Sequence, residues 1–581
     1  MSRSALVAAL AVAALVFAVP AAGAATAPST NTIGGATAPV PSQTTSPPAD
    51  PNALVSPPSL DRPPASHRLS GRQAMRIADR LEDVRGTRRN HPGSYREVYE
   101  KGPSRWQVSY FAAGKQRKEI AQVLIDDATG GVLEHWTGFQ VAWTMARGYP
   151  GAFGRKVNEP WIWIPLAVLF VIPFFDWRRP LRWFHLDLLA LSAFSVSIAF
   201  FNAADIGLSV PLAYPPLAYL FVRMLVIAVR RGRAPPPAVS ELPRVTVPAV
   251  WLAVGVVFLL GFRIGLNVES SNVIDVGYSG VIGADRLLHG KTLYGNFPSG
   301  NERGDTYGPV AYEAYVPAVK LFGWSGRWDD LPAAHFAAIV FDLLAVALLF
   351  LIGRRARGPD LGIALAYAWA AYPFTIFVSN SNTNDSLVTV CVLLALLAAG
   401  RPLRAGAASA LAGLTKFAPL ALAPVLATHR LRRGGRVRGL GLFALGFAIV
   451  AAVVSLPFLG ENVHTVYDRT IGFQSSRGSP FSIWGLYDWT APQHVVQAAG
   501  VLVALALALV PGRRDLAGLA AACAAVLIGL QLGVTHWFYL YIAWFFPLVM
   551  IAGLCRDVRP DPPSAPAADR SPPPAAPLAR T

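Results

Sequence analysis

The residues that could do chemistry gather in a few polar segments between long apolar runs. Asp275 and Asp305 stand in one such segment, residues 267–331. A carboxylate can take a proton from a hydroxyl group within hydrogen-bond reach, so both are candidate general bases. Asp275 could equally order the loop by capping a helix. Asp305 competes with it because Asp305 lies beside the aromatic residue Tyr307.

Four further residues could hold an anion such as a phosphate group, because cationic hydrogen-bond donors stabilise negative charge. They are Lys416, Arg477, His536 and Arg303. Lys416 lies inside the apolar stretch Ala405–Thr428, and a lysine at membrane depth is a functional candidate by default. Its side chain could also snorkel to the membrane surface. Arg477 could meet lipid headgroups, and His536 could be a structural hydrogen-bonding residue.

Polar and aromatic residues between the apolar runs could bind a hydroxyl-rich ligand. The turn 379–385 contains Asn384 and Asp385, which suit hydroxyl groups but suit a tight turn equally well. The candidate stacking residues are Tyr278, Tyr294, Tyr307, Trp484 and Trp489. An interfacial aromatic belt explains any single one of them as well. No spacing of acidic residues demands a metal, so a divalent cation stays open, and no nucleotide-binding loop is present.

The composition indicates that membrane helices position these residues. Of 581 residues, 53% are hydrophobic and 15% are charged, and the mean hydropathy is +0.40. About 25% charged residues is usual for a soluble protein. These values exclude an ordinary soluble enzyme and a wholly disordered chain, which needs low hydrophobicity. Three cysteines, all in apolar runs, predict neither a disulfide framework nor a Cys-based metal site.

The excess of basic residues indicates how the chain is oriented in the membrane. The net charge of +17 (51 Lys and Arg against 34 Asp and Glu) comes largely from short arginine clusters between apolar runs, such as Arg178/Arg179/Arg182 and Arg354/Arg355/Arg357. This is the positive-inside pattern, so a lipid bilayer and not nucleic acid is the expected partner. Alternating clusters predict a plasma-membrane protein with an exported N-terminal domain, polar loops on the outer face and a cytoplasmic C-terminus.

The apolar runs predict about eleven transmembrane helices and one broken hairpin. The spans lie near 161–176, 184–203, 209–229, 246–266, 332–353, 360–378, 384–400, 438–458, 493–511, 515–534 and 536–555. Ala405–Thr428 is bounded by basic clusters on both sides, so we expect two half-helices that return to the cytoplasmic side. Broken helices are tolerated at this depth when protein surrounds them. Four outer segments, 267–331, 379–385, 459–492 and 533–537, should converge on one face.

The first 140 residues divide into three predicted parts. Residues 1–24 have the pattern of a signal peptide, or alternatively of an uncleaved anchor. Residues 25–68 form a linker rich in Pro, Ala, Ser and Thr. In residues 69–140, helical spacing over Gln73–Val84 and alternating stretches over Tyr95–Tyr99, Trp106–Phe111, Ala121–Ile125 and Val132–Trp136 predict a helix followed by a small antiparallel sheet. The order W-x-V, then D-x-x-T-G-x-V, resembles the PepSY module, which implies a small extracytoplasmic α+β domain.

The membrane part resembles a known enzyme family. Asp275 early in the first outer loop, then Gly290, Leu293 and Tyr294, then the run Tyr307-Gly308-Pro309, follow the order of elements in glycosyltransferase family 87. This resemblance covers about residues 246–555. It implies an all-α polytopic GT-C fold, with 161–245 as three accessory helices, 246–555 as the catalytic core and 556–581 as a disordered tail.

The resemblance also implies an activity. Such an enzyme moves a sugar, with mannose expected here, from a polyprenyl-phosphate donor to an envelope glycolipid or glycan on the outer face. Asp275 is then the first candidate for the base and Asp305 the second, in a displacement that inverts the anomeric centre. Lys416, Arg477, His536 and Arg303 would surround the donor phosphate. Two alternatives stay open: a flippase of lipid-linked sugars, and a PepSY-type sensor or assembly factor on a membrane scaffold.

Overall fold

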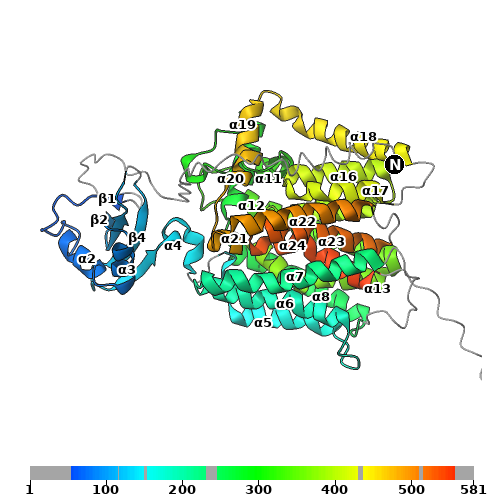
Figure 1. Cartoon of the computed structure of the whole chain (residues 1–581), viewed down its shortest axis with the longest axis horizontal. Helices are drawn as coiled ribbons and strands as arrows, with labels where there is room; N and C mark the ends of the chain where they lie inside the picture. Colours follow the sequence, from blue (N-terminus) through cyan, green and yellow to red (C-terminus); the bar gives the residue numbers. More distant parts are fainter. Residues whose placement is uncertain are drawn as a thin grey trace, which may run out of the picture.

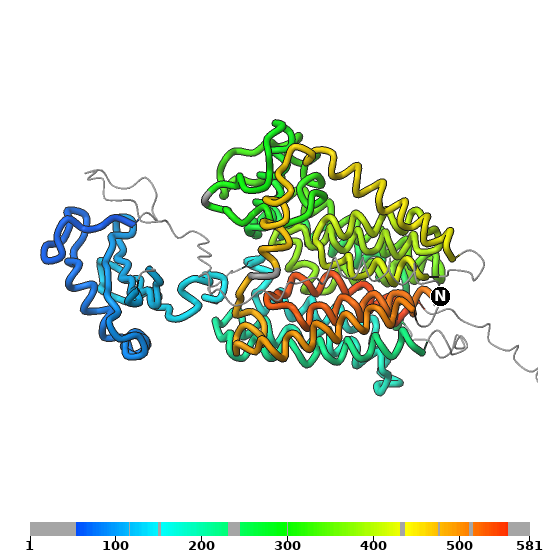
Figure 2. The backbone as a smooth tube through the Cα atoms, turned by 45° about the horizontal axis from the view of Figure 1, so that its top comes forward, coloured from blue at the N-terminus to red at the C-terminus, as the bar shows by residue number. Residues whose placement is uncertain are grey.

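The computed structural model describes residues 54–114, 117–148, 153–230, 245–429, 436–509 and 515–555. The predicted signal peptide, residues 25–53 of the predicted linker and the predicted C-terminal tail lie outside these residues. The prediction of a linker is wrong for residues 54–68, which belong to the N-terminal domain, because Leu54 pairs with Lys101 and the N–H of Arg68 donates to Asp127. A small α+β domain stands at one end of a large helical bundle, and a short connector joins the two (Figures 1 and 2). The predicted fold class, a helical membrane core with a small N-terminal sheet, is confirmed.

The N-terminal domain packs two helices on an antiparallel sheet. Its order is β1 Leu54–Val55, α2 Gly71–Ala78, α3 Glu82–Asn90, β2 Tyr95–Lys101, β3 Arg105–Phe111, β4 Glu119–Asp126 and β5 Val132–Thr137. The strands lie in sequence order across the sheet. Trp106 pairs with Ile125 and Val108 with Val123, so the period-two pattern puts these apolar residues in one core.

The predicted single helix over Gln73–Val84 is wrong in one respect, because the chain breaks into α2 and α3. The break lies at Asp79, which receives hydrogen bonds from Arg88, Arg96 and Tyr110. A carboxylate that binds three partners outside its own helix favours a helix end there. The predicted strands and the turn at 126–131 are present. The resemblance to PepSY stays a prediction.

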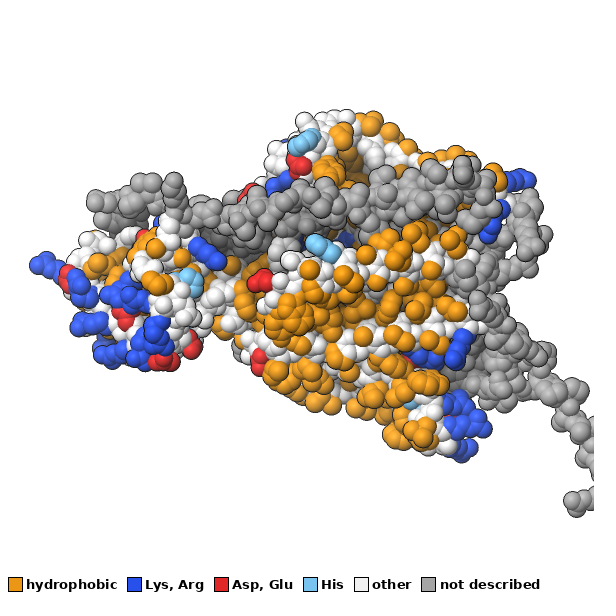
Figure 3. All heavy atoms as spheres, in the orientation of Figure 1, with side chains coloured by type: hydrophobic (Ala, Val, Ile, Leu, Met, Phe, Trp, Pro, Cys, Tyr) orange, Lys and Arg blue, Asp and Glu red, His pale blue; other side chains and the backbone are white. Residues whose placement is uncertain are grey.

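The bundle contains most of the remaining chain. Its helices are α5 Pro160–Val171, α6 Trp183–Asn202, α7 Ile206–Arg230, α8 Ala249–Glu269, α12 Pro332–Arg357, α13 Pro359–Ala371, α14 Pro373–Asn380, α15 Asp385–Ala398, α16 Pro402–Thr415, α17 Ala423–Thr428, α18 Arg436–Ser455, α22 Thr490–Leu509, α23 Leu516–Gly533 and α24 Ile542–Leu554. The side of the bundle seen in Figure 3 is largely hydrophobic, whereas charged side chains cover much of the N-terminal domain. This contrast is expected of a membrane core that carries a soluble domain.

Among the described residues, seven helices are long and apolar enough to cross a membrane, or eight if the bent pair α13–α14 counts as one. The other three predicted spans are shorter helices, Pro160–Phe174, Asp385–Ala398 and Tyr539–Leu554. The predicted span 360–378 is therefore bent, by 60°. The bend lies before Pro373, whose missing N–H and ring are incompatible with a continuous helix.

The broken hairpin is present where it was predicted. Helix α16 ends at Thr415, Lys416 is extended, and a 3-10 turn over Ala418–Leu422 leads into α17. Both the turn and α17 pack against α16. Pro419 has no backbone N–H, and its ring clashes with the preceding turn of a helix, so it cannot continue α16. The break is therefore expected from the sequence.

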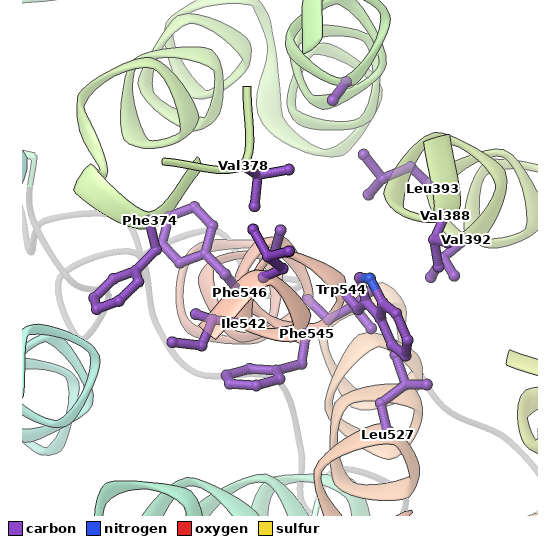
Figure 4. Packing of buried hydrophobic residues seen from close by; sticks show 14 of the residues in the cluster. Phe374, Val378, Val388, Val392, Leu393, Leu527, Ile542, Trp544, Phe545 and Phe546 are labelled. Carbon is purple, nitrogen blue, oxygen red and sulfur yellow. The ribbon is translucent and has the colours of Figure 1, made fainter. Parts of the chain in front are cut away.

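The three accessory helices pack into the bundle rather than standing apart from it. Helix α7 lies against α6 and α23, and the hydroxyl of Tyr539 hydrogen bonds to Ser197 and Ser209 of α6 and α7. Aromatic and branched side chains of α14, α15 and α24 fill the centre, among them Phe374, Val388 and Phe546 (Figure 4). Ion pairs lie inside the bundle, among them Arg223 with Asp187 and Arg263 with Asp342.

Candidate functional site

The four predicted outer segments meet at the end of the bundle that faces the N-terminal domain. Backbone hydrogen bonds join Asn272 to the carbonyl of Asn380 (3.1 Å) and Trp537 to the carbonyl of Phe481 (3.4 Å). Leu293 donates its N–H to the carboxylate of Glu461. The expected convergence is thus observed, and it brings together residues that lie far apart in the chain.

Helix α9, Asp275–Leu288, carries the first candidate base at its first position. The helix approaches the turn 379–385 closely because Gly277 has no side chain. A Cβ atom there would lie 2.1 Å from the carbonyl oxygen of Asn382. The N–H of Ile274 also donates to the carbonyl of Ser381 (3.3 Å). These contacts fix the start of α9, and with it the backbone of Asp275, against α14 and α15.

Lys416 and Asp385 form a buried ion pair beside this point. Lys416 Nζ donates to Asp385 Oδ1 at 2.6 Å, and the Asp385 side chain has no exposed surface. Trp544 Nε1 donates to the same oxygen (2.9 Å), and Thr383 Oγ1 donates to the other (2.8 Å). Such complete hydrogen bonding is what a buried carboxylate requires. Asp385 therefore accepts hydrogen bonds from three side-chain donors.

Aromatic rings enclose the lysine end of this pair. Lys416 Nζ lies 5.3 Å from the ring centre of Tyr307, 5.4 Å from that of Trp544 and 5.7 Å from that of Tyr541. All three are within cation–π range. Tyr307 comes this close because Gly308 donates its N–H to the carbonyl of Thr415 at 3.3 Å.

Arg477 differs from Lys416 in its hydrogen bonding. Its Nε atom is buried and has no hydrogen-bond partner among the described residues. Its guanidinium carbon lies 5.6 Å from the ring centre of Trp143 and 5.7 Å from that of Phe473. His536 stacks on the same Trp143 ring and its Nδ1 lies 2.9 Å from Ser479 Oγ. Arg477 therefore keeps hydrogen-bonding capacity for a ligand.

Electrostatic coupling links these residues into one cluster. Burial raises the pKa of Asp275 above that of an ordinary aspartate, while Arg477 and Lys416 lower it and Asp385 raises it. Burial also lowers the pKa of His536 well below its usual value, and Arg477 and Lys416 lower it further. His536 is thus neutral near pH 7, so it can offer an anion a hydrogen bond but not a positive charge.

The structure places Asp305 in a different environment. One of its oxygens accepts from Arg469 Nε (2.7 Å) and from the N–H of Gly295 (2.6 Å), and the side chain is fully buried. Arg469 also donates to the carbonyl of Glu302. Asp305 therefore ties the first outer loop to the second, which is an arrangement suited to positioning.

The other predicted site residues are distributed around the cluster. Arg303 is exposed, with its guanidinium 5.3 Å from the Phe473 ring centre that Arg477 also contacts. Tyr294 donates its hydroxyl to the carbonyl of Tyr307 (3.0 Å) and so supports that loop. Tyr278 packs on Trp328, and Trp484 donates to the carbonyl of Leu532. The amide group of Asn384 is buried without a hydrogen-bond partner among the described residues.

Sequence reasoning missed three contributors to this cluster. Tyr541 and Trp544 lie in the run THWFYLYIAWFFP, in which the sequence indicated only His536 as a candidate and the start of the last span. Trp143 lies in the connector that follows strand β5, and nothing in the sequence around it indicated a function. Each places its ring near a cation of the cluster, and an aromatic residue in an apolar run gives no sign of which cation it will contact. No group of three or more metal-binding side chains occurs in the described part of the chain.

Comparisons with known proteins show what parts of the chain are similar to. No curated protein matches the sequence. Among solved structures, that of ArnT from Cupriavidus metallidurans bound to undecaprenyl phosphate is similar at 19% identity and a TM-score of 0.36, over 53% of this chain and 60% of that chain. The stretch from 306 to 546, which holds Tyr307, Asp385, Lys416, Arg477 and His536, matches the model of glycosyltransferase family 87.

Proposed function

We propose that the protein is a membrane glycosyltransferase that takes its sugar from a polyprenyl-phosphate donor. The observation that carries this proposal is the cluster itself: a half-buried carboxylate, Asp275, electrostatically coupled to Arg477 and to the Lys416–Asp385 pair. A displacement at an anomeric carbon needs a base at the attacking hydroxyl and cations at the leaving phosphate. The match to glycosyltransferase family 87 supports the same class of reaction.

The proposed reaction is a single displacement. The acceptor hydroxyl oxygen attacks the anomeric carbon, and its proton passes to Asp275. The bond between that carbon and the phosphate oxygen breaks, and its electron pair stays on polyprenyl phosphate. Arg477 stabilises this charge directly, since its Nε has no other partner among the described residues. The products are an inverted glycoside and polyprenyl phosphate.

We also propose that the site faces the outer side of the membrane and that the acceptor is an envelope glycolipid or glycan. Exposed arginines lie at the C-terminal end of α12, away from the site, and positive charge favours the cytoplasmic side. The site then faces outward, where an envelope glycolipid or glycan is the available acceptor. Mannose is the first sugar to test.

Single-turnover transfer in proteoliposomes tests the proposal. Full-length protein receives radiolabelled polyprenyl-phosphate mannose, glucose or pentose together with an envelope glycolipid extract. We expect label in the glycolipid with wild type, and a loss of at least about 100-fold with Asp275→Asn, the scale of a lost general base. Asp329→Asn is the matched control, because Asp329 is an exposed carboxylate of the same loop. Lipid that crosses the bilayer with its sugar uncleaved would instead identify a flippase.

A further inference from the structure

The connector between the N-terminal domain and the first membrane helix enters the candidate site. It includes α4 Phe139–Ala142 and a 3-10 turn over Thr144–Arg147, and Trp143 lies between them. The Trp143 side chain is buried although the residue follows directly after the soluble domain. Its ring contacts Arg477 at 5.6 Å, Phe481 at 5.3 Å and His536 at 6.0 Å, measured between ring centres or to the guanidinium carbon.

The backbone around Trp143 is firmly held. The N–H of Trp143 donates to the carbonyl of Phe139 (2.8 Å), and Gln140 Nε2 bridges the carbonyls of Ala146 and Ala204. The latter carbonyl belongs to the turn between α6 and α7. Gly148 packs on the same turn at φ +54°, where a Cβ atom would lie 2.3 Å from the nitrogen of Ala204. The connector is therefore anchored to the bundle on its own account, and the ring of Trp143 has a defined position.

The guanidinium group of Arg477 lies over this ring. Its guanidinium carbon lies over the ring of Trp143 (5.6 Å) and over that of Phe473 (5.7 Å), and its Nε has no hydrogen-bond partner in the described part of the chain. Two ring faces restrain a planar guanidinium while leaving its N–H groups directed outward at the edges. His536 stacks on the same indole with an interplanar angle of 27°. One side chain from the connector thus contacts two polar groups of the site.

We propose that Trp143 is a positioning residue for the donor phosphate, so that the exported N-terminal domain and its connector are a structural part of the transferase site. This inference rests on the proposed function. The N-terminal region then has a defined role, because its attachment to the bundle presents Trp143 to Arg477 and His536. The donor end of the site, and not the acceptor end, should therefore be sensitive to changes in this region.

Steady-state transfer by full-length variants in proteoliposomes tests the proposal. Trp143→Leu removes the ring face, and we expect the KM for the labelled polyprenyl-phosphate sugar to rise about tenfold, as for the loss of one desolvated cation–π contact. The KM for the acceptor should stay unchanged. Trp143→Phe keeps a ring face and should restore most of the donor affinity. Trp161→Leu, an exposed tryptophan of α5, is the matched control and should behave as wild type.

A pH profile separates positioning from a general structural defect. Arg477 lowers the pKa of Asp275, so a displaced Arg477 should move the acid limb of the activity to higher pH in Trp143→Leu but not in Trp143→Phe. An unchanged donor KM in Trp143→Leu, or equal losses in the Leu and Phe variants, would overturn the proposal. A wild-type protein that transfers no sugar would instead refute the proposed function on which it rests.

Discussion

Lys416 and Arg477, the two cations coupled to Asp275, differ in whether they are already bound to a carboxylate. Lys416 is bound to Asp385 at 2.6 Å, whereas Arg477 Nε has no hydrogen-bond partner among the described residues. A cation bound to a carboxylate has less attraction left for a second anion. Arg477 is therefore the better candidate for direct contact with a phosphate, and the Lys416–Asp385 pair is better suited to hold the surrounding loops together.

The coupling between Asp275 and Arg477 predicts a pH effect. A base must be ionised to act, so activity should fall as the pH drops through the pKa of Asp275. Because burial raises that pKa, the acid limb should lie above the ordinary aspartate value of about 3.9. Arg477→Gln removes a positive charge that lowers the pKa, so the limb should move to higher pH. Arg327→Gln, which alters an exposed ion pair, should leave the profile in place.

The Lys416–Asp385 pair predicts a non-additive effect on stability. Lys416→Met alone leaves the carboxylate of Asp385 buried beside an apolar side chain, and breaking a buried pair in this way costs about 3–5 kcal/mol. The double variant Lys416→Met with Asp385→Asn should recover much of that loss, because no buried charge is then left unpaired. Thermal unfolding in detergent measures both. Equal and additive losses would argue against a tight pair.

At the scale of elements, glycines allow the segments of the site to pack closely, because a glycine has no side chain at the contact. Helix α9 reaches the turn 379–385 at Gly277, and the Tyr307 loop reaches the end of α16 at Gly308. In both places a Cβ atom would collide with a backbone carbonyl, which cannot move aside as a side chain can. The break after α16 then puts Lys416 at the point where these elements meet.

Gly308→Ala tests this account of the packing. The new Cβ atom would lie 2.1 Å from the carbonyl oxygen of Leu414, so the Tyr307 loop must move away from Lys416. We expect at least about a tenfold loss of sugar transfer, the scale of a small misplacement of reacting groups. Gly300→Ala in the same loop is the control, because nothing lies within 4 Å of its Cβ position. Equal activity of the two variants would contradict the proposed arrangement.

At the scale of the whole molecule, the site and the exposed arginines of α12 lie at opposite ends of the bundle. The site end carries the N-terminal domain, as Figure 1 shows. If the arginines face the cytoplasm, the N-terminal domain and the site share the outer side. The two ends can be distinguished because the three native cysteines, Cys391, Cys523 and Cys555, are buried and give little background labelling.

Cysteine labelling of intact cells with an impermeant maleimide tests this orientation. We expect reagent to reach Asp329→Cys, in the exposed first outer loop, and not Arg355→Cys, at the far end of α12. Permeabilised cells should label at both positions, which controls for reactivity. Labelling of Arg355→Cys alone in intact cells would invert the proposed topology.

The sequence by itself determined the class of protein, the helical spans and the residues most able to do chemistry. Apolar length and arginine clusters depend on local composition, and the broken hairpin at Lys416 follows from Pro419. Only the tertiary structure decided which of those residues lie in contact. It paired Lys416 with Asp385, bound Asp305 to Arg469, and brought Trp143 to Arg477. These contacts, two ion pairs and one ring contact, join segments that are distant in the sequence, so no local pattern of residues contains their geometry.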